Sequence, residues 1–212
     1  MCLVAALGVG GYLWWLLWGT GIITKHAQAD LRQQIQARID EPRWHGVPPP
    51  PDGGLARSEG AASPRERQAS IVVPGGAVAI LRIPKLHLDM VVVEGTDTES
   101  LTKGPGHYLG TAFPWDHTGR VGIAGHRTTY LHPFWSLDHL VPGDLVELVT
   151  EFGTFDYRVT GSAVILPSEG WVLDQTKRPS LVLTTCTPRF SASHRLVVFA
   201  ARMAVQRQDL AA

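Results

Sequence analysis

Two residues near the C-terminus have the types and the spacing that nucleophilic chemistry requires. Cys186 ends a run of strand-forming residues, and Arg195 opens the next such run nine positions later. A thiolate is a strong nucleophile, and a nearby guanidinium favours the thiolate and can donate hydrogen bonds to an oxyanion. The other cysteine, Cys2, borders an apolar segment, so no disulfide is expected around Cys186. Cys186 is therefore either a working thiol or a small buried core residue.

Thiol catalysis also needs a group that passes a proton to the leaving amine. His126 is the candidate because it follows the strand-like run 120–125, whose last residue, Gly125, permits a close approach. It could face the thiol across a barrel. Thr185 is either a plain strand residue or a donor to the oxyanion through its hydroxyl or backbone amide. The remaining histidines are expected in the linker or at the surface: His26, His45, His87, His107, His117, His132, His139 and His194.

Metal and nucleic-acid chemistry find no support in the sequence. Zinc sites need several Cys or His at fixed spacings, and neither a CxxC nor an HExxH pattern occurs. The formal net charge is zero and the sequence pI is about 7.1, so nothing indicates nucleic-acid binding. Glu94, Asp97 and Glu99 are expected to form a solvated acidic loop and not an ion site. We therefore expect no metal and no cofactor.

Short strand-like runs position these residues from about residue 71 onward. Apolar runs bounded by Pro and Gly, without long helical patterns, predict a mainly β fold that closes, or nearly closes, into a barrel. Only Glu151, Phe152 and Gly153 separate two of these runs, which predicts a hairpin. The expected strands cover residues 78–83, 90–93, 120–125, 144–150, 154–160, 164–166, 180–184 and 196–200.

The N-terminal part differs in composition. From Leu3 to Thr24 no residue is charged over 22 positions, which is long enough for a helix that spans a bilayer. A cleaved secretory signal is the alternative, because Ala27-Gln28-Ala29 has the look of a cleavage site. The apolar run is longer than a usual signal core, however, and no basic residue precedes it. We therefore expect a retained anchor over residues 1–25.

A helix and a spacer are expected between this anchor and the barrel. Leu31, Ile35 and Ile39 recur at helical spacing, and ten of the thirty residues 41–70 are Pro or Gly. Such a segment buries too little apolar surface to fold and predicts an extended spacer. The predicted organisation is an anchor (1–25), a short helix and linker (26–70), a catalytic barrel (71–206) and a C-terminal tail (207–212).

Together these motifs resemble those of the sortases, the membrane-anchored cysteine transpeptidases of bacterial surfaces. Residues 182–186 (VLTTC) resemble the family's T-L-x-T-C signature, with Val182 in place of the first Thr, and His126 and Arg195 follow the family's order. The similarity covers about residues 78–205. Further matches are 83–86 (IPKL), 92–95 (VVEG), 103–108 (KGPGHY) and 110–112 (GTA).

Within that family, residues 124–130 and 185–190 are most similar to class E, and class D is the second choice. Tyr130 matches a tyrosine that, in class E sortases, is associated with a preference for a Leu-Ala-x-Thr-Gly signal. Thr187 stands where class E usually has His, which leaves the subclass and the substrate preference open.

The resemblance implies a sortase-like eight-stranded barrel with short helices. It implies that Cys186 attacks the Thr-Gly bond of a C-terminal sorting signal of the LPXTG or LAXTG type, that His126 is the acid/base, and that Arg195 holds the carbonyl. The acceptor would be a cell-wall precursor amine. It also implies a single-pass membrane protein with an extracytoplasmic barrel, although Lys25, Arg32 and Arg38 after the anchor favour the cytoplasm.

Two alternatives remain at this point. One is a cysteine peptidase or amidase that hydrolyses the thioester. The other is an anchored binding module in which Cys186 is merely buried.

Overall fold

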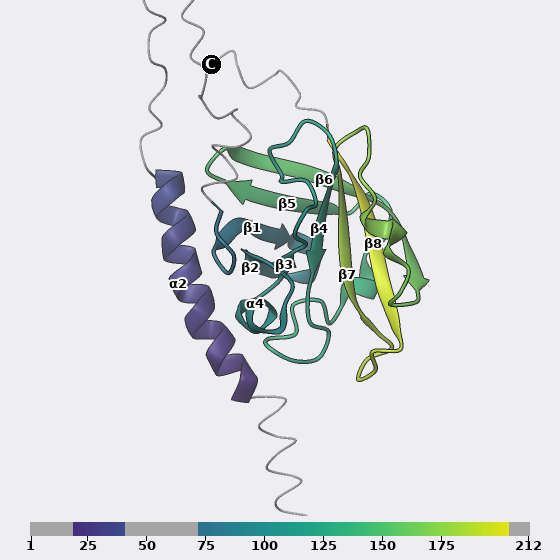
Figure 1. The fold of residues 1–212 in the computed structure, drawn as a ribbon, viewed down its shortest axis with the longest axis horizontal. Coiled ribbons are helices and arrows are strands. Elements are labelled where there is room, and N and C mark those ends of the chain that lie inside the picture. Colours follow the sequence, from purple (N-terminus) through teal and green to yellow (C-terminus); the bar gives the residue numbers. More distant parts are fainter. Residues whose placement is uncertain (1–18, 41–71, 204–212) are drawn as a thin grey trace, which may run out of the picture.

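The computed structural model describes residues 19–40 and 72–203, which form a long helix lying beside a closed β-barrel (Figure 1). The strand order around the barrel is β1-β2-β3-β4-β7-β8-β6-β5, which confirms the expected eight-stranded, mainly β fold. The helices are α2 (Thr20–Asp40), α4 (Thr98–Lys103) and three short 3₁₀ helices (Pro84–Leu86, Leu137–His139 and Gly170–Leu173). The strands are β1 (Ala77–Ile83), β2 (Leu88–Glu94), β3 (Gly106–His107), β4 (Arg120–Ala124), β5 (Leu145–Thr150), β6 (Gly153–Ile165), β7 (Ser180–Thr187) and β8 (His194–Arg202).

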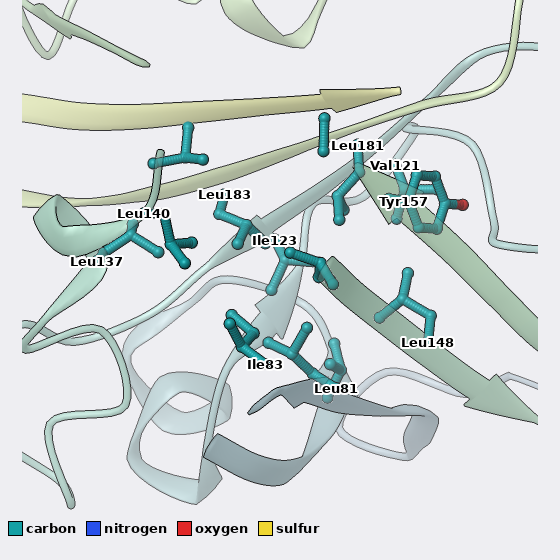
Figure 2. Close-up of a cluster of buried hydrophobic side chains, with 14 of the residues drawn as sticks. Leu81, Ile83, Val121, Ile123, Leu137, Leu140, Leu148, Tyr157, Leu181 and Leu183 are labelled. Carbon is teal, nitrogen blue, oxygen red and sulfur yellow. The ribbon is translucent and has the colours of Figure 1, made fainter. Parts of the chain in front are cut away.

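The barrel interior is filled by branched aliphatic side chains from most of the strands (Figure 2). Side chains alternate between the two faces of a strand, and β5 shows this directly, with every second residue buried. Leu81, Leu148 and Leu183 are each at most 1% exposed. Burying one such side chain contributes about 1.5–3 kcal/mol, so the apolar runs supply most of the driving force for closure.

Two strands differ from the sequence prediction. The runs 154–160 and 164–166 are one strand, β6, because a bulge between Val159 and Gly161 shifts its register on β8 without ending the strand. β3 was not predicted, since it has only two residues, Gly106 and His107, and carries no apolar run. The predicted hairpin is confirmed: β5 and β6 pair antiparallel up to Thr150 opposite Gly153.

Two strand pairs bring the candidate residues to one end of the barrel. β4 and β7 run parallel, with Ala124 in register with Thr184, so both strands end at the same edge. β7 and β8 run antiparallel, with Cys186 directly opposite Arg195. The residues that follow β4 therefore meet the end of β7 and the start of β8.

Helix α2 packs along the outside of β1 and β2. Leu31 and Ile35 are buried against Ala77, Ile80 and neighbouring apolar residues of these strands. Gln28 bonds to the β2 backbone: Nε2 donates to Val91 O (2.9 Å), and Val91 N donates to Oε1 (2.7 Å). The helix thus supplies hydrogen bonds to an edge of β2.

This packing bears on the two N-terminal expectations. Because α2 lies on the barrel, both ends of the segment 41–71 are attached to one body, so its length does not set the distance between the predicted anchor and the barrel. The predicted spacer, residues 41–70, lies outside the described residues. No helix within residues 19–40 and 72–203 is long and apolar enough to cross a bilayer. The predicted anchor ends too late, because residues 20–25 belong to α2, where Thr24 is fully buried and donates to Thr102 O (2.8 Å). Residues 1–18 of the predicted anchor lie outside the described residues.

Candidate active site

Cys186, His126 and Arg195 line one pocket of about 200 Å³ at the end of the barrel. Gly125 N donates to Thr184 O (3.0 Å), so the β4–β7 pairing continues one step beyond β4. His126 and Cys186 follow next on these neighbouring parallel strands. The two residues therefore lie side by side at one edge of the sheet, and the prediction that they face each other across the barrel is wrong.

Arg195 lies opposite Cys186 in the antiparallel pair, where side chains project from the same face of a sheet. Its Nη1 donates to two backbone oxygens of the β7–β8 turn, Ala192 O (3.0 Å) and His194 O (3.1 Å). Among the described residues, Nε and Nη2 have no hydrogen-bond partner. The turn therefore orients the guanidinium and leaves donors that a carbonyl oxygen in the pocket can accept from.

Cys186 is half-buried and has no disulfide partner among the described residues. Its backbone oxygen accepts a long hydrogen bond from Arg127 Nη1 (3.5 Å). Arg127 is only 5% exposed and pairs with Asp138 (3.0 Å). Arg127, the residue after His126, thus links the loop that follows β4 to the end of β7. Its place beside His126 was the only sign of this role in the sequence.

His126 is half-buried, and this burial lowers the pKa of its imidazole below the ordinary value. Desolvation disfavours the charged form of a histidine, so the neutral ring is favoured at neutral pH. The Tyr130 ring lies against it, with centroids 4.9 Å apart. Tyr130 has a positive φ of 52°, and Leu131 (62°) and His132 (38°) after it also have positive φ values. Tyr130 thus flanks His126 but is not among the residues that line the Cys186 pocket.

Thr185 and Tyr108 fix the walls of the pocket. The Thr185 hydroxyl donates to Gly125 O (2.7 Å), so it links β7 to the end of β4 and does not point freely at the thiol. The Tyr108 hydroxyl is 2.8 Å from Thr184 Oγ1, and both residues line the pocket. Tyr108 belongs to a motif noted in the sequence, but it had no predicted role.

Gly125 has a packing role beside His126. A Cβ at this position would lie 2.6–3.0 Å from ring atoms of Phe134, which is fully buried. Phe134 N in turn donates to His126 O (3.1 Å). The absence of a side chain at Gly125 therefore lets the loop fold back and hold the histidine backbone.

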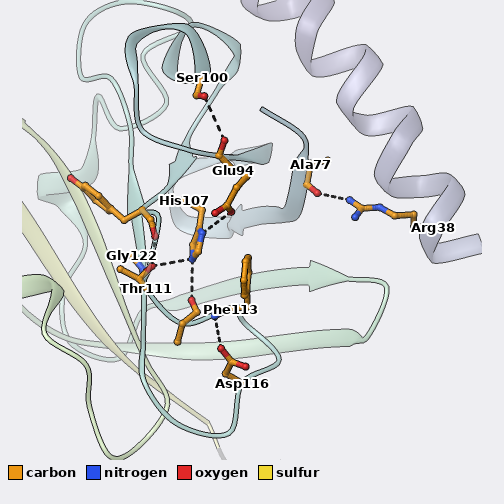
Figure 3. A network of polar contacts seen from close by, with 11 residues as sticks. Arg38, Ala77, Glu94, Ser100, His107, Thr111, Phe113, Asp116 and Gly122 are labelled. Atoms are coloured by element: carbon orange, nitrogen blue, oxygen red, sulfur yellow. Dashed lines mark hydrogen bonds and ion pairs between the residues drawn. The ribbon is translucent and has the colours of Figure 1, made fainter. Parts of the chain in front are cut away.

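A buried polar network centres on His107, the residue before Tyr108 (Figure 3). His107 is 1% exposed, and its Nδ1 donates to Glu94 Oε2 (2.8 Å). Its Nε2 is 3.0 Å from both Ala112 O and Thr111 Oγ1. Both ring nitrogens thus have hydrogen-bond partners, as buried polar groups generally do.

This network corrects two expectations. His107 is not a surface histidine, and Glu94 is not part of a solvated acidic loop. Asp97 of the same stretch caps α4 by accepting from Ser100 N (3.0 Å). Within residues 19–40 and 72–203, no three His, Cys, Asp or Glu side chains gather closely enough to hold a metal ion.

Comparison with known proteins places this geometry in a family. A family model for the sortase domain matches residues 81–203, more than half of the chain. The chain belongs to the sortase family. This confirms the resemblance drawn from the motifs around Cys186, His126 and Arg195.

Two curated relatives represent the two subclasses that the motifs favoured. The sortase is 34% identical to sortase D of Bacillus subtilis over 134 residues, which cover 61% of this chain and 65% of the relative. It is 36% identical to sortase SrtE1 of Streptomyces coelicolor over 141 residues, covering 59% and 40%. The chain thus spans less than two thirds of the length of either relative.

Solved structures agree with the fold. Sortase E1 of Streptomyces coelicolor, solved with a tripeptide in its active site, has a TM-score of 0.59 at 33% identity and covers 63% of this chain and 91% of that one. A Clostridium perfringens sortase D5 transpeptidase has a TM-score of 0.66 and covers 84% and 99%; at 23% identity it supports the fold alone.

Proposed function

We propose that this sortase cleaves the Thr-Gly bond of a C-terminal sorting signal and transfers the acyl group to an amine. The single observation that carries the proposal is the meeting of Cys186, His126 and Arg195 in one pocket of a sortase domain. The signal would be of the LPXTG or LAXTG type, and the acceptor a cell-wall precursor amine, so that the product is a protein attached to the wall.

The geometry supports a thioester mechanism that begins from a neutral pair. Burial lowers the pKa of His126, so its neutral ring accepts the thiol proton as Cys186 Sγ attacks the threonine carbonyl. The unpaired donors of Arg195 stabilise the oxyanion. The C–N bond breaks as His126 returns the proton to the glycine amine. An incoming amine then attacks the thioester, gives a proton to His126 and releases the thiolate, which regains it.

The uncharged run that begins at Leu3 completes the proposal as a single-pass anchor, with the barrel on the extracytoplasmic side. The run extends over 17 residues before α2 starts at Thr20, which is about the shortest length that spans a bilayer. Membership of a family that acts at the bacterial surface also supports it. Tyr130 is the proposed selector of a Leu-Ala-x-Thr-Gly signal, and its contact with the His126 ring supports a place beside the bound peptide.

A peptide assay with product identification by mass spectrometry tests the reaction. The full chain in detergent is incubated with a Leu-Ala-x-Thr-Gly or Leu-Pro-x-Thr-Gly peptide and triglycine. We expect a transpeptidation product that disappears in Cys186→Ala and persists in the matched control Cys2→Ala. Hydrolysed peptide at every amine concentration would instead make the protein a peptidase. No cleavage, with Cys186 unreactive to a thiol probe, would make it a binding module.

A further inference from the structure

A second pocket lies beside the catalytic one at the same end of the barrel. Its volume is about 360 Å³. It is formed between the first turns of α2, the loop after His126 and the β7–β8 turn, and it shares no residue with the Cys186 pocket. The lining residues are Gly21, Ile22, Lys25, Thr128, Leu131, His132, Trp135 and Phe190.

The rim of this pocket exposes large apolar side chains to an unusual degree. Phe190 is 73% exposed and Ile22 58%, and Trp135 lies between α2 and the turn at 36%. Phe190 packs edge-on against Trp135, with ring centroids 6.0 Å apart. Single exposed apolar residues are ordinary, whereas a contiguous group around a pocket is typical of an interaction surface.

The charges around this rim are basic. Lys25 lies in the lining, which holds no acidic residue, and Arg189 stacks over the Trp135 ring at 4.7 Å. The nearby carboxylate of Asp138 is already paired with Arg127 (3.0 Å) and Arg189 (3.2 Å). An apolar surface edged by Lys and Arg complements a layer whose interior is apolar and whose surface is anionic.

The course of the chain identifies that layer. The uncharged run from Leu3 to Thr24 ends inside α2, and two of its last residues, Gly21 and Ile22, line the pocket. Figure 1 shows the N-terminal end of α2 at the same end of the molecule as the turn between β7 and β8. The anchor proposed above, which precedes α2, therefore leaves the bilayer at this rim.

We infer that the rim of the second pocket docks on the headgroup–acyl boundary of an anionic bilayer, with Ile22, Trp135 and Phe190 inserted and Lys25 and Arg189 at the phosphates. Trp is enriched at such boundaries, and the long stem of Lys allows its charge to stay at the headgroups. The Cys186 pocket then opens at the membrane surface, where a membrane-held substrate presents its chain. This inference rests on the proposed anchoring and is separate from the proposed reaction.

Photocrosslinking from the full chain in lipid vesicles tests this docking. The photoreactive residue p-benzoylphenylalanine replaces Phe190 in one variant and Trp171 in a matched control. Trp171 is also an exposed aromatic, at 50%, but it lines a pocket with Arg120 and Ser180 at the opposite end of β4 and β7. We expect at least about fivefold more lipid adduct from position 190, rising when phosphatidylglycerol is added to phosphatidylcholine and falling in high salt.

Each other outcome overturns a different claim. Equal adducts at both positions, or none at position 190 in vesicles that carry the protein on flotation, overturn the docking. A chain that does not float with the vesicles overturns both the anchor and the docking. Transpeptidation measured on the same vesicles reports on the proposed reaction, so its loss with the position-190 adduct intact overturns the reaction alone.

Discussion

His126 and Tyr130 form a ring contact that contributes to the burial of the imidazole. The tyrosine ring covers one side of the imidazole, and burial is the cause of the lowered pKa of His126. Removing the ring in Tyr130→Ala should admit water and raise the pKa of His126 toward its ordinary value, whereas Tyr130→Phe should leave it low. Titration of the His126 ring by NMR measures this, and an unchanged pKa in Tyr130→Ala would contradict it.

The lowered pKa of His126 determines how activity and stability should change with pH. Attack requires neutral His126 to take the thiol proton, so the acid limb of kcat/KM should move to higher pH in Tyr130→Ala. In the wild type the folded pKa lies below the unfolded one. His126 therefore costs no stability above the unfolded pKa, and it destabilises the fold as pH falls from there through the folded pKa.

The sequence predicted the residues whose side chains would react with or bind the substrate better than the residues that support them. Cys186 and Arg195 bracket a short turn between two strand-like runs, so their meeting was predictable from pairing alone. Arg127 was not predictable, because its partners Asp138 and Cys186 belong to a separate 3₁₀ helix and to β7. Burial that depends on distant segments leaves no local pattern, and the same reason explains the error on His107.

At the scale of elements, the end of β4 packs so closely on the loop after it that Gly125 leaves no room for a methyl group. Gly125→Ala places a Cβ against the fully buried Phe134 ring, and overpacking of this kind costs about 1–3 kcal/mol. The strand end that carries His126 must also shift. The turnover rate should therefore fall by more than the loss of folded protein accounts for. Chemical denaturation and peptide turnover measure the two effects.

The control for this change is another strand glycine. Gly161 in β6 has open space where its Cβ would be, so Gly161→Ala should be close to neutral. Shortening the obstructing ring in Gly125→Ala/Phe134→Leu should recover part of the activity. A fully active Gly125→Ala enzyme would show that the close packing does not position His126.

The buried pair of Glu94 and His107 should stabilise the end of β3 and the loop that carries Tyr108. Glu94→Ala leaves the buried Nδ1 of His107 without its acceptor, which costs about 1–3 kcal/mol. Glu94→Gln keeps an acceptor oxygen and should cost less. Thermal or urea unfolding measures the loss, and the exposed Glu99→Ala serves as a control expected within about 0.5 kcal/mol of wild type.

Element prediction succeeded where apolar runs were long and failed where structure depends on pairing. Strand β5 and the first part of β6 were predicted because their runs alternate or are bounded by turn residues. The two residues of β3 pair with β2 and β4 only because the barrel closes around them. The bulge that keeps β6 continuous is likewise imposed by its pairing with β8.

At the scale of the whole molecule, Gln28 should hold α2 to the barrel. Its amide serves Val91 N and Val91 O and also donates to Lys103 O (2.8 Å), so it takes the place of a neighbouring strand where β3 is too short. Gln28→Ala leaves these backbone groups unpaired and should cost about 1–3 kcal/mol. Hydrogen exchange at the Val91 amide should accelerate sharply.

A helix residue that faces solvent provides the comparison. Gln33→Ala, on the exposed side of α2, should leave exchange at Val91 unchanged. Equal exchange in Gln28→Ala and wild type would show that the helix does not protect β2. The sequence predicted a helix here from Leu31, Ile35 and Ile39, but a stripe of three apolar residues does not say which surface it covers.

The seating of α2 on the barrel determines the path of mechanical load through the molecule. Tension between a fixed N-terminus and a protein held as a thioester at Cys186 would enter through α2, cross to β1 and β2, and reach β7 through β3 and β4. The other contacts on that path are ladders of backbone hydrogen bonds between strands. We therefore expect the side-chain contacts of Gln28, Leu31 and Ile35 with the barrel to break first under tension.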